Sequence, residues 1–232
     1  MASMTRESVL RPGMFGVAAC ADSRRYEFDS GNEELLLAGI RPDVVFIGDS
    51  ITHLWELQAY FGGTGSILIN RGIGGDNSTH VRQRFSADVL QLHPRLAVLK
   101  IGTNDLGWNL EQFTETMPNT ICENITAIAI DAQAAGVPLA ICSLLPIWGP
   151  SWYPVPGYAE KKNAQIIEIN TRLRAITADH GAFYVDYYAQ MIDANGMLQH
   201  DLADDGIHPH AYGYTIMARV LREKLAEMGI TF

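Results

Sequence analysis

The sequence Val44-Val45-Phe46-Ile47-Gly48-Asp49-Ser50 predicts a buried strand that ends abruptly at a glycine, a carboxylate and a hydroxyl. A serine at such a strand-to-helix corner is presented to a cleft, where its hydroxyl can act as a nucleophile. Ser50 taken alone also fits the N-cap of the following helix. The role of Ser50 therefore depends on which residues of the rest of the chain lie next to it.

Short apolar runs alternate with longer amphipathic segments along the chain. We expect strands near Val44 to Ile47, Ile67 to Asn70, Leu96 to Ile101, Leu139 to Leu144 and Phe183 to Val185. Helical spacing with a core-facing stripe is found at Ile121, Ile125 and Ile128, at Ile166, Ile169, Leu173 and Ile176, and at Tyr212, Ile216, Leu221 and Leu225. This alternation predicts an α/β fold with a five-stranded parallel sheet covered by helices.

The chain of 232 residues, 47% of them hydrophobic, is long enough to bury a sizeable core. No repeat or flexible linker divides it, so we expect a single domain over residues 42–232. Residues 1–41 are expected to form an irregular N-terminal extension that packs on this domain. An insertion over residues 146–157 is rich in proline, which prevents a regular helix. It follows the fourth strand, which puts it on the rim of the sheet where ligands enter.

Composition excludes several classes of partner. The net charge of -9, without a dense run of Lys or Arg, argues against nucleic acid as a partner. No apolar stretch reaches the roughly 18 residues that a membrane span needs, so we expect no stable membrane insertion. The three cysteines fit neither a disulfide set nor a metal site, and we expect a cytoplasmic protein, with secretion the less favoured alternative.

Polar segments follow the predicted strands at one edge of the sheet. Ser50 follows the first strand, Gly75 lies after the second and Asn104 after the third, while Asp205 and His208 precede the last helix. A serine nucleophile needs a base, and an imidazole held by a carboxylate supplies one, so His208 and Asp205 are the candidate base and orienting acid. The backbone amides of Ser50 and Gly75 and the side-chain amide of Asn104 are candidate oxyanion donors.

Four sequence blocks resemble those of the SGNH, or GDSL, hydrolases. They are Gly48-Asp49-Ser50, Asn70-Arg71-Gly72-Ile73-Gly74-Gly75-Asp76, Gly102-Thr103-Asn104-Asp105 and Asp205-Gly206-Ile207-His208-Pro209. The glycine block, and Leu144-Leu145-Pro146 followed by Asn163 and Asn170, look similar to the intracellular platelet-activating-factor acetylhydrolases and related bacterial esterases. The resemblance implies a three-layer, flavodoxin-like α/β/α fold and ester hydrolysis through an acyl-serine, without a metal or other cofactor. It also implies that Ser50, His208 and Asp205 form the triad and that Gly75 and Asn104 complete the oxyanion hole.

A metal site is the competing interpretation of the last block. Asp204, Asp205, His208 and His210 place oxygen and nitrogen ligands close together, but their spacing does not match the helical zinc pattern. We therefore expect no metal, with Asp204 a solvated neighbour and His210 a residue at a helix start. Asp105 is expected to form a turn.

Aromatic residues near the strand ends are candidates for a substrate pocket. They are Trp55, Trp108, Trp148, Trp152 and Tyr153, and packing at the rim is the alternative for each. The last three are favoured because the proline-rich insertion holds them outside the core.

These observations predict a carboxylic ester hydrolase for a small-molecule ester, with small acyl groups such as acetyl on a carbohydrate or lipid-like alcohol. Two alternatives stay open at this point. The same site can transfer the acyl group to an alcohol instead of water, or the chain can be a non-catalytic binding module on the same fold. A homo-oligomer is compatible with the sequence.

Overall fold

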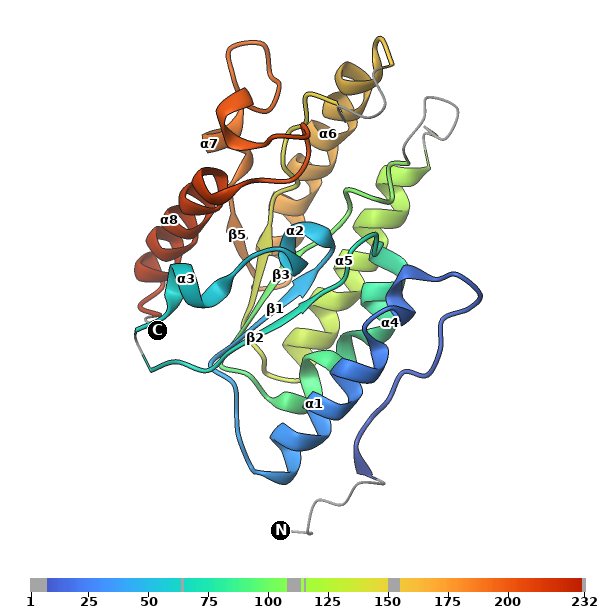
Figure 1. The fold of residues 1–232 in the computed structure, drawn as a ribbon, viewed down its shortest axis with the longest axis vertical. Coiled ribbons are helices and arrows are strands. Elements are labelled where there is room, and N and C mark those ends of the chain that lie inside the picture. Colours follow the sequence, from blue (N-terminus) through green and yellow to red (C-terminus); the bar gives the residue numbers. More distant parts are fainter. Residues whose placement is uncertain (1–7, 64, 108–113, 115, 150–154, 231–232) are drawn as a thin grey trace.

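The computed structural model describes residues 8–63, 65–107, 114, 116–149 and 155–230. Its strands are β1 (Val44–Gly48), β2 (Leu68–Gly72), β3 (Leu96–Lys100), β4 (Leu139–Cys142) and β5 (Phe183–Val185). Its α-helices are α1 (Arg25–Leu37), α2 (Ser50–His53), α3 (Leu57–Phe61), α4 (Ser78–Asp88), α5 (Met117–Ala134), α6 (Tyr158–Asp179), α7 (Tyr188–Met191) and α8 (Ala211–Glu227). Short 3-10 turns lie at Cys20–Asp22, Leu90–Leu92 and His200–Leu202. Figure 1 shows how these elements are arranged.

The five strands form one parallel sheet in the order β2-β1-β3-β4-β5. The chain first moves outward from β1 to β2 and then crosses back to β3 on the other side of β1. The point between β1 and β3, where this direction changes, is where open α/β sheets bind their ligands, beyond the carboxyl ends of the strands. The fold therefore places a site next to the end of β1.

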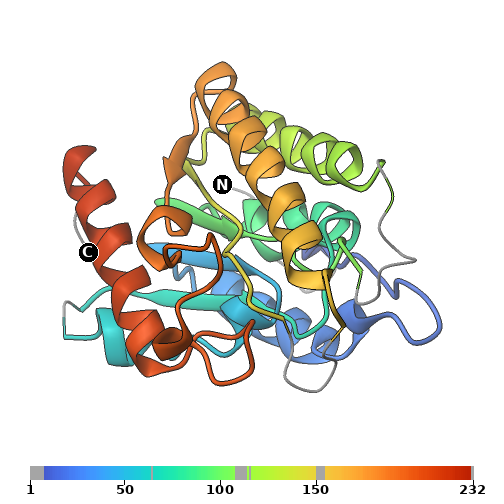
Figure 2. The same cartoon turned by 90° about the horizontal axis from the view of Figure 1, so that it is seen from above.

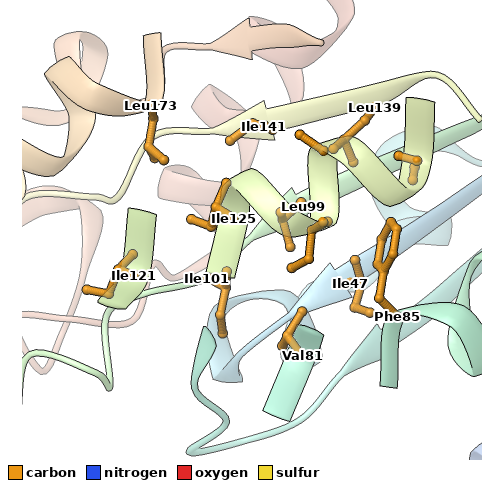
Figure 3. Packing of buried hydrophobic residues seen from close by; sticks show 14 of the residues in the cluster. Ile47, Val81, Phe85, Leu99, Ile101, Ile121, Ile125, Leu139, Ile141 and Leu173 are labelled. Atoms are coloured by element: carbon orange, nitrogen blue, oxygen red, sulfur yellow. The ribbon is translucent and has the colours of Figure 1, made fainter. Parts of the chain in front are cut away.

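Helices cover both faces of the sheet, which gives the three-layer α/β/α fold expected (Figure 2). On one face, Val45, Ile47 and Leu99 pack against α4, α5 and α6 (Figure 3). On the other face, Phe46 and Val98 pack against side chains of α2, α3, α7 and α8. Because both faces of β1 and β3 are buried, these strands are apolar at every position except the last.

All five strands lie where the sequence predicts them; β5 has the predicted bounds, and the other four strands end at different residues. β2 runs two residues further than expected, and β4 stops at Cys142 instead of Leu144. Beyond the end of β4, the Leu144 N–H donates to the side chain of Asn170 at 2.8 Å instead of to a neighbouring strand. The predicted core stripes of α5 and α6 are confirmed, but Tyr212 in the first turn of α8 is 60% exposed and does not belong to the core.

The expectation of an irregular segment over residues 1–41 is wrong for its second half, which contains the 13-residue helix α1. Arg25 of this helix donates to both carboxylate oxygens of Asp88 in α4. The side chain of Asn32 donates to the Ala87 carbonyl at 3.1 Å. The helix is thus attached to the domain by buried polar contacts.

Within the part of the chain that the structure describes, every helix is too short or too polar to cross a lipid bilayer.

Candidate active site

Three of the predicted site residues are joined by hydrogen bonds at the carboxyl edge of the sheet. The Ser50 hydroxyl lies 2.8 Å from Nε2 of His208, although 158 positions separate the two residues in sequence. On the other side of the imidazole, Nδ1 lies 2.6 Å from Oδ2 of Asp205. The three side chains form one continuous line from hydroxyl to carboxylate.

The carboxylate of Asp205 is also held by the backbone of its own loop. Oδ1 accepts hydrogen bonds from the N–H of Ile207 at 2.9 Å and of His208 at 2.7 Å. Burial alone would raise the pKa of Asp205, but the hydrogen bonds from His208 and Ile207 outweigh it and lower the pKa below its usual value. The carboxylate is therefore ionised when the imidazole needs a negative partner.

Gly206 lets this loop turn tightly under the indole of Trp148. Its φ is +83°, and a Cβ there would lie 2.1 Å from the Gly149 carbonyl oxygen and 2.8 Å from the Trp148 ring. The backbone N–H of Trp148 donates to the Gly206 carbonyl at 3.2 Å. These contacts fix the backbone between Asp205 and His208.

Ser50 is the first residue of α2, and the N-cap of that helix is Asp49. Oδ1 of Asp49 accepts a hydrogen bond from the Ile51 N–H at 3.0 Å. Asp49, and not Ser50, therefore caps this helix, and the Ser50 hydroxyl points to His208. The Ser50 N–H lies in the first helical turn, where backbone donors have no partner within the helix.

Gly75 and Asn104 line one cavity of about 400 Å³, together with Asn77, Asp105, Met117 and Thr120. Gly75 has a φ of +78°, which glycine adopts without strain, and a Cβ there would lie 2.7 Å from the sulfur of Cys20. Asn104 donates from Nδ2 to the Asp76 carbonyl at 2.8 Å. An amide nitrogen carries two hydrogens, so this bond orients the side chain and leaves a second hydrogen for a ligand.

Asp105 does more than form a turn. Its carboxylate accepts hydrogen bonds from the Ser78 N–H at 3.1 and 3.0 Å and from the Ser78 hydroxyl at 2.5 Å. Burial raises the pKa of Asp105 despite these hydrogen bonds. Asp105 thereby joins the loop that carries Asn104 to the start of α4.

Of the five aromatic residues predicted for a substrate pocket, two lie within the described residues. Trp55 is 4% exposed and packs against Phe46, Phe61 and Tyr214 in the core, so its proposed place in a substrate pocket is wrong. Trp148 lies at the rim, where its ring contacts His200 with centroids 4.7 Å apart. Trp108, Trp152 and Tyr153 lie outside the described residues, as does part of the 146–157 insertion.

The four residues of the competing metal-site interpretation have other contacts. Asp205 and His208 bind each other, and His210 caps α8 by accepting from the Tyr212 N–H at 3.1 Å, while Asp204 is exposed. In the described ranges, no group of three or more His, Cys, Asp or Glu side chains is arranged to hold a metal ion.

One buried charged residue next to the site was missed from the sequence. Lys100 ends β3, and its ammonium donates to Asp49 at 3.1 Å and to Thr103 at 2.7 Å. The signal was present, since a lysine within the apolar run Leu96 to Ile101 needs a buried anion as its partner.

A serine, a histidine and a carboxylate joined in this order define a site of the serine hydrolase class. The sequence model of the GDSL-like lipase/acylhydrolase family matches residues 46–216, which is most of the chain. The protein belongs to this family of esterases and acylhydrolases, as its four sequence blocks predicted.

Individual relatives agree with this assignment. The chain is 30% identical to human platelet-activating factor acetylhydrolase IB subunit alpha1 over 210 residues, which cover 88% of this chain and 81% of the relative. It is 24% identical to an acetylxylan esterase of Xylanibacter ruminicola, over 69% of this chain and 34% of that protein. The crystal structure of a GDSL-like lipase from Bacteroides thetaiotaomicron superposes with a TM-score of 0.74 at 28% identity, covering 90% of this chain and 99% of the lipase.

Proposed function

We propose that the protein hydrolyses carboxylic esters through an acyl-enzyme on Ser50 and that it removes small acyl groups, acetyl first among them, from a carbohydrate or lipid-like alcohol. The observation that carries this proposal is the line of hydrogen bonds from Ser50 to His208, at 2.8 Å, and from His208 to Asp205, at 2.6 Å.

The reaction follows from this geometry in two halves. Ser50 Oγ attacks the ester carbonyl carbon while His208 Nε2 takes the hydroxyl proton, and Asp205 stabilises the resulting imidazolium. The negative charge that develops on the carbonyl oxygen is met by the N–H groups of Ser50 and Gly75 and by the amide of Asn104. His208 then gives its proton to the leaving alcohol, and a water molecule, activated by the same imidazole, releases the acid and restores Ser50.

The preference for a small acyl group rests on relatives. The human relative is named an acetylhydrolase and the Xylanibacter relative an acetylxylan esterase, so both names refer to acetyl esters. Their alcohols differ, which is why the proposal keeps both carbohydrate and lipid-like alcohols. The proposal also places the enzyme in the cytoplasm, in keeping with its three free cysteines.

Covalent labelling tests the nucleophile. We expect a fluorophosphonate to modify Ser50, as located by peptide mapping, and we expect His208→Ala to lose the label because the hydroxyl then lacks its base. A label on another serine, or activity that a chelator removes without any labelled serine, contradicts the proposal.

Product analysis separates hydrolysis from the two alternatives. Acetate release from aryl acetates is measured with and without a competing alcohol. We expect acetate to remain the main product in both cases. An acetylated alcohol as the main product would make the protein an acyltransferase, and no turnover on any ester would favour a binding module.

A further inference from the structure

Lys100 connects two loops that follow different strands. It is the last residue of β3 and only 3% exposed. Its ammonium donates to Oδ2 of Asp49, which follows β1, and to the hydroxyl of Thr103, which follows β3. The lysine therefore lies at the β1/β3 position of the sheet, where the ligand site is expected.

Each acceptor is the chain neighbour of a proposed site residue. Asp49 precedes Ser50, and its second oxygen caps the turn of α2 in which Ser50 lies. Thr103 precedes Asn104, whose amide is already oriented by the Asp76 carbonyl. A shift of the ammonium would thus move the hydroxyl and the amide relative to each other.

Stability alone does not explain the ion pair between Lys100 and Asp49. Asp49 is 0% exposed, and a buried pair of charges is often no more stable than apolar side chains of similar volume. An apolar pair at these positions would fill the space between β1 and β3 but would make no directed bond to either loop. The direction of the bonds is what the charged pair adds.

We propose that Lys100 is a positioning residue of the esterase site, which holds the Asp49-Ser50 and Thr103-Asn104 segments at a set separation so that nucleophile and oxyanion donor act on the same carbonyl group. This inference rests on the proposed function. Its effect falls on kcat more than on KM, because the negative charge on the carbonyl oxygen develops only as the bond to Ser50 forms and is absent from the bound ester.

Three variants separate positioning from charge balance. Lys100→Met leaves the buried Asp49 carboxylate without its cation and is expected to lose stability. The double variant Lys100→Met with Asp49→Asn removes both charges, while the amide oxygen of the new side chain can still cap α2. Thr103→Val keeps the ion pair and removes only its link to the Asn104 segment.

We expect the double variant to melt close to the wild-type temperature while its kcat for 4-nitrophenyl acetate falls about 10- to 100-fold, with KM changed less than about threefold. Thr103→Val should lower kcat about tenfold or more. The control is Leu225→Ala, which opens a cavity near the far end of α8, about 20 Å along the helix from its start. It should lower the melting temperature without changing kcat below that temperature.

The rate of Ser50 labelling by a fluorophosphonate is measured in parallel. If the double variant and Thr103→Val both keep the wild-type kcat and labelling rate, the positioning role is overturned. Lys100 is then only a counter-ion of Asp49. A wild-type protein that is not labelled at Ser50 would instead contradict the proposed function. If the double variant does not fold, Thr103→Val decides the question, since it retains the ion pair.

Discussion

The two carboxylate oxygens of Asp205 have different hydrogen-bond partners. Oδ1 is bound to the backbone N–H groups of Ile207 and His208, so the rotamer of the carboxylate is set by its own loop. Oδ2 is left to face Nδ1 of the imidazole at 2.6 Å. With Nδ1 carrying the hydrogen, Nε2 has a lone pair to accept the proton of Ser50.

Replacing Asp205 by Asn should therefore reduce activity much more than stability. The amide can present N–H to Nδ1 and stabilise the wrong tautomer, and it cannot balance an imidazolium. We expect kcat/KM for an aryl acetate to fall about 10³- to 10⁴-fold. The matched control is Asp204→Asn, an exposed neighbour, which should stay within about twofold of wild type. Equal losses in the two variants would contradict the role of Asp205.

The motif residues could be predicted as a set, whereas the pocket could not. Ser50 follows from a polar block at the end of the first strand, and Asp205 and His208 follow from a polar block just before the last helix. Trp55 was misplaced because an aromatic residue just after a strand end can turn outward to a ligand or inward to the core. Here it turns inward, against Phe46 and Tyr214.

Elements differ in how plainly the sequence shows them. Each strand contains a short apolar run, so the five strands were predicted. Helix α1 was missed because its buried face consists of Arg25, Phe28 and Asn32, two of which are polar. Hydrophobic periodicity fails where a helix is anchored by ion pairs.

Arg25 joins α1 to Asp88 of α4, and its removal should destabilise the whole domain. Burial alone would raise the pKa of Asp88, but the guanidinium groups of Arg25 and Arg84 keep that pKa below its usual value. Arg25→Met leaves the buried carboxylate with fewer partners, and we expect a loss of about 2 to 4 kcal/mol in the free energy of unfolding in urea. The control Arg95→Met removes an exposed pair with Asp43, 63% exposed at the arginine, and should cost less than about 1 kcal/mol. A loss no larger for Arg25 than for Arg95 would contradict the anchoring role.

The whole molecule brings together segments that lie far apart in the chain. That they meet at one sheet edge could be predicted, since parallel strands share a carboxyl edge. The order of the strands could not, because β1 and β3 are both buried on both faces and their apolar runs do not say which strand lies beside which. Nor does the sequence show which polar side chains pair beneath that edge.

The buried side chain of Lys162 should make the stability of the whole protein depend on pH. Lys162 in α6 donates to the Gly107 carbonyl and to the Tyr158 hydroxyl, and burial, with the nearby charge of Lys100, lowers its pKa from 10.5 to about 7. Between these two values the unfolded chain binds one proton more than the folded protein. The contribution of Lys162 to the free energy of unfolding therefore rises with pH, by up to about 1.4 kcal/mol per pH unit.

Urea unfolding of wild type and Lys162→Met at pH values between about 7 and 10 measures this contribution. We expect the difference between the two proteins to grow in favour of wild type as the pH rises. The exposed neighbour provides the control, since Lys161→Met should keep a constant difference from wild type. If the difference in unfolding free energy between wild type and Lys162→Met did not change with pH, the pKa of Lys162 would be the same in the folded and unfolded states.

The contact between Cys20 and Gly75 has a practical consequence. Of the three cysteines, Cys122 and Cys142 are buried and Cys20 is exposed. Its sulfur lies 2.7 Å from the point where a Cβ on Gly75 would stand. A maleimide dye is therefore expected to attach to the natural protein at a single cysteine, beside the glycine turn that lines the cavity with Asn104.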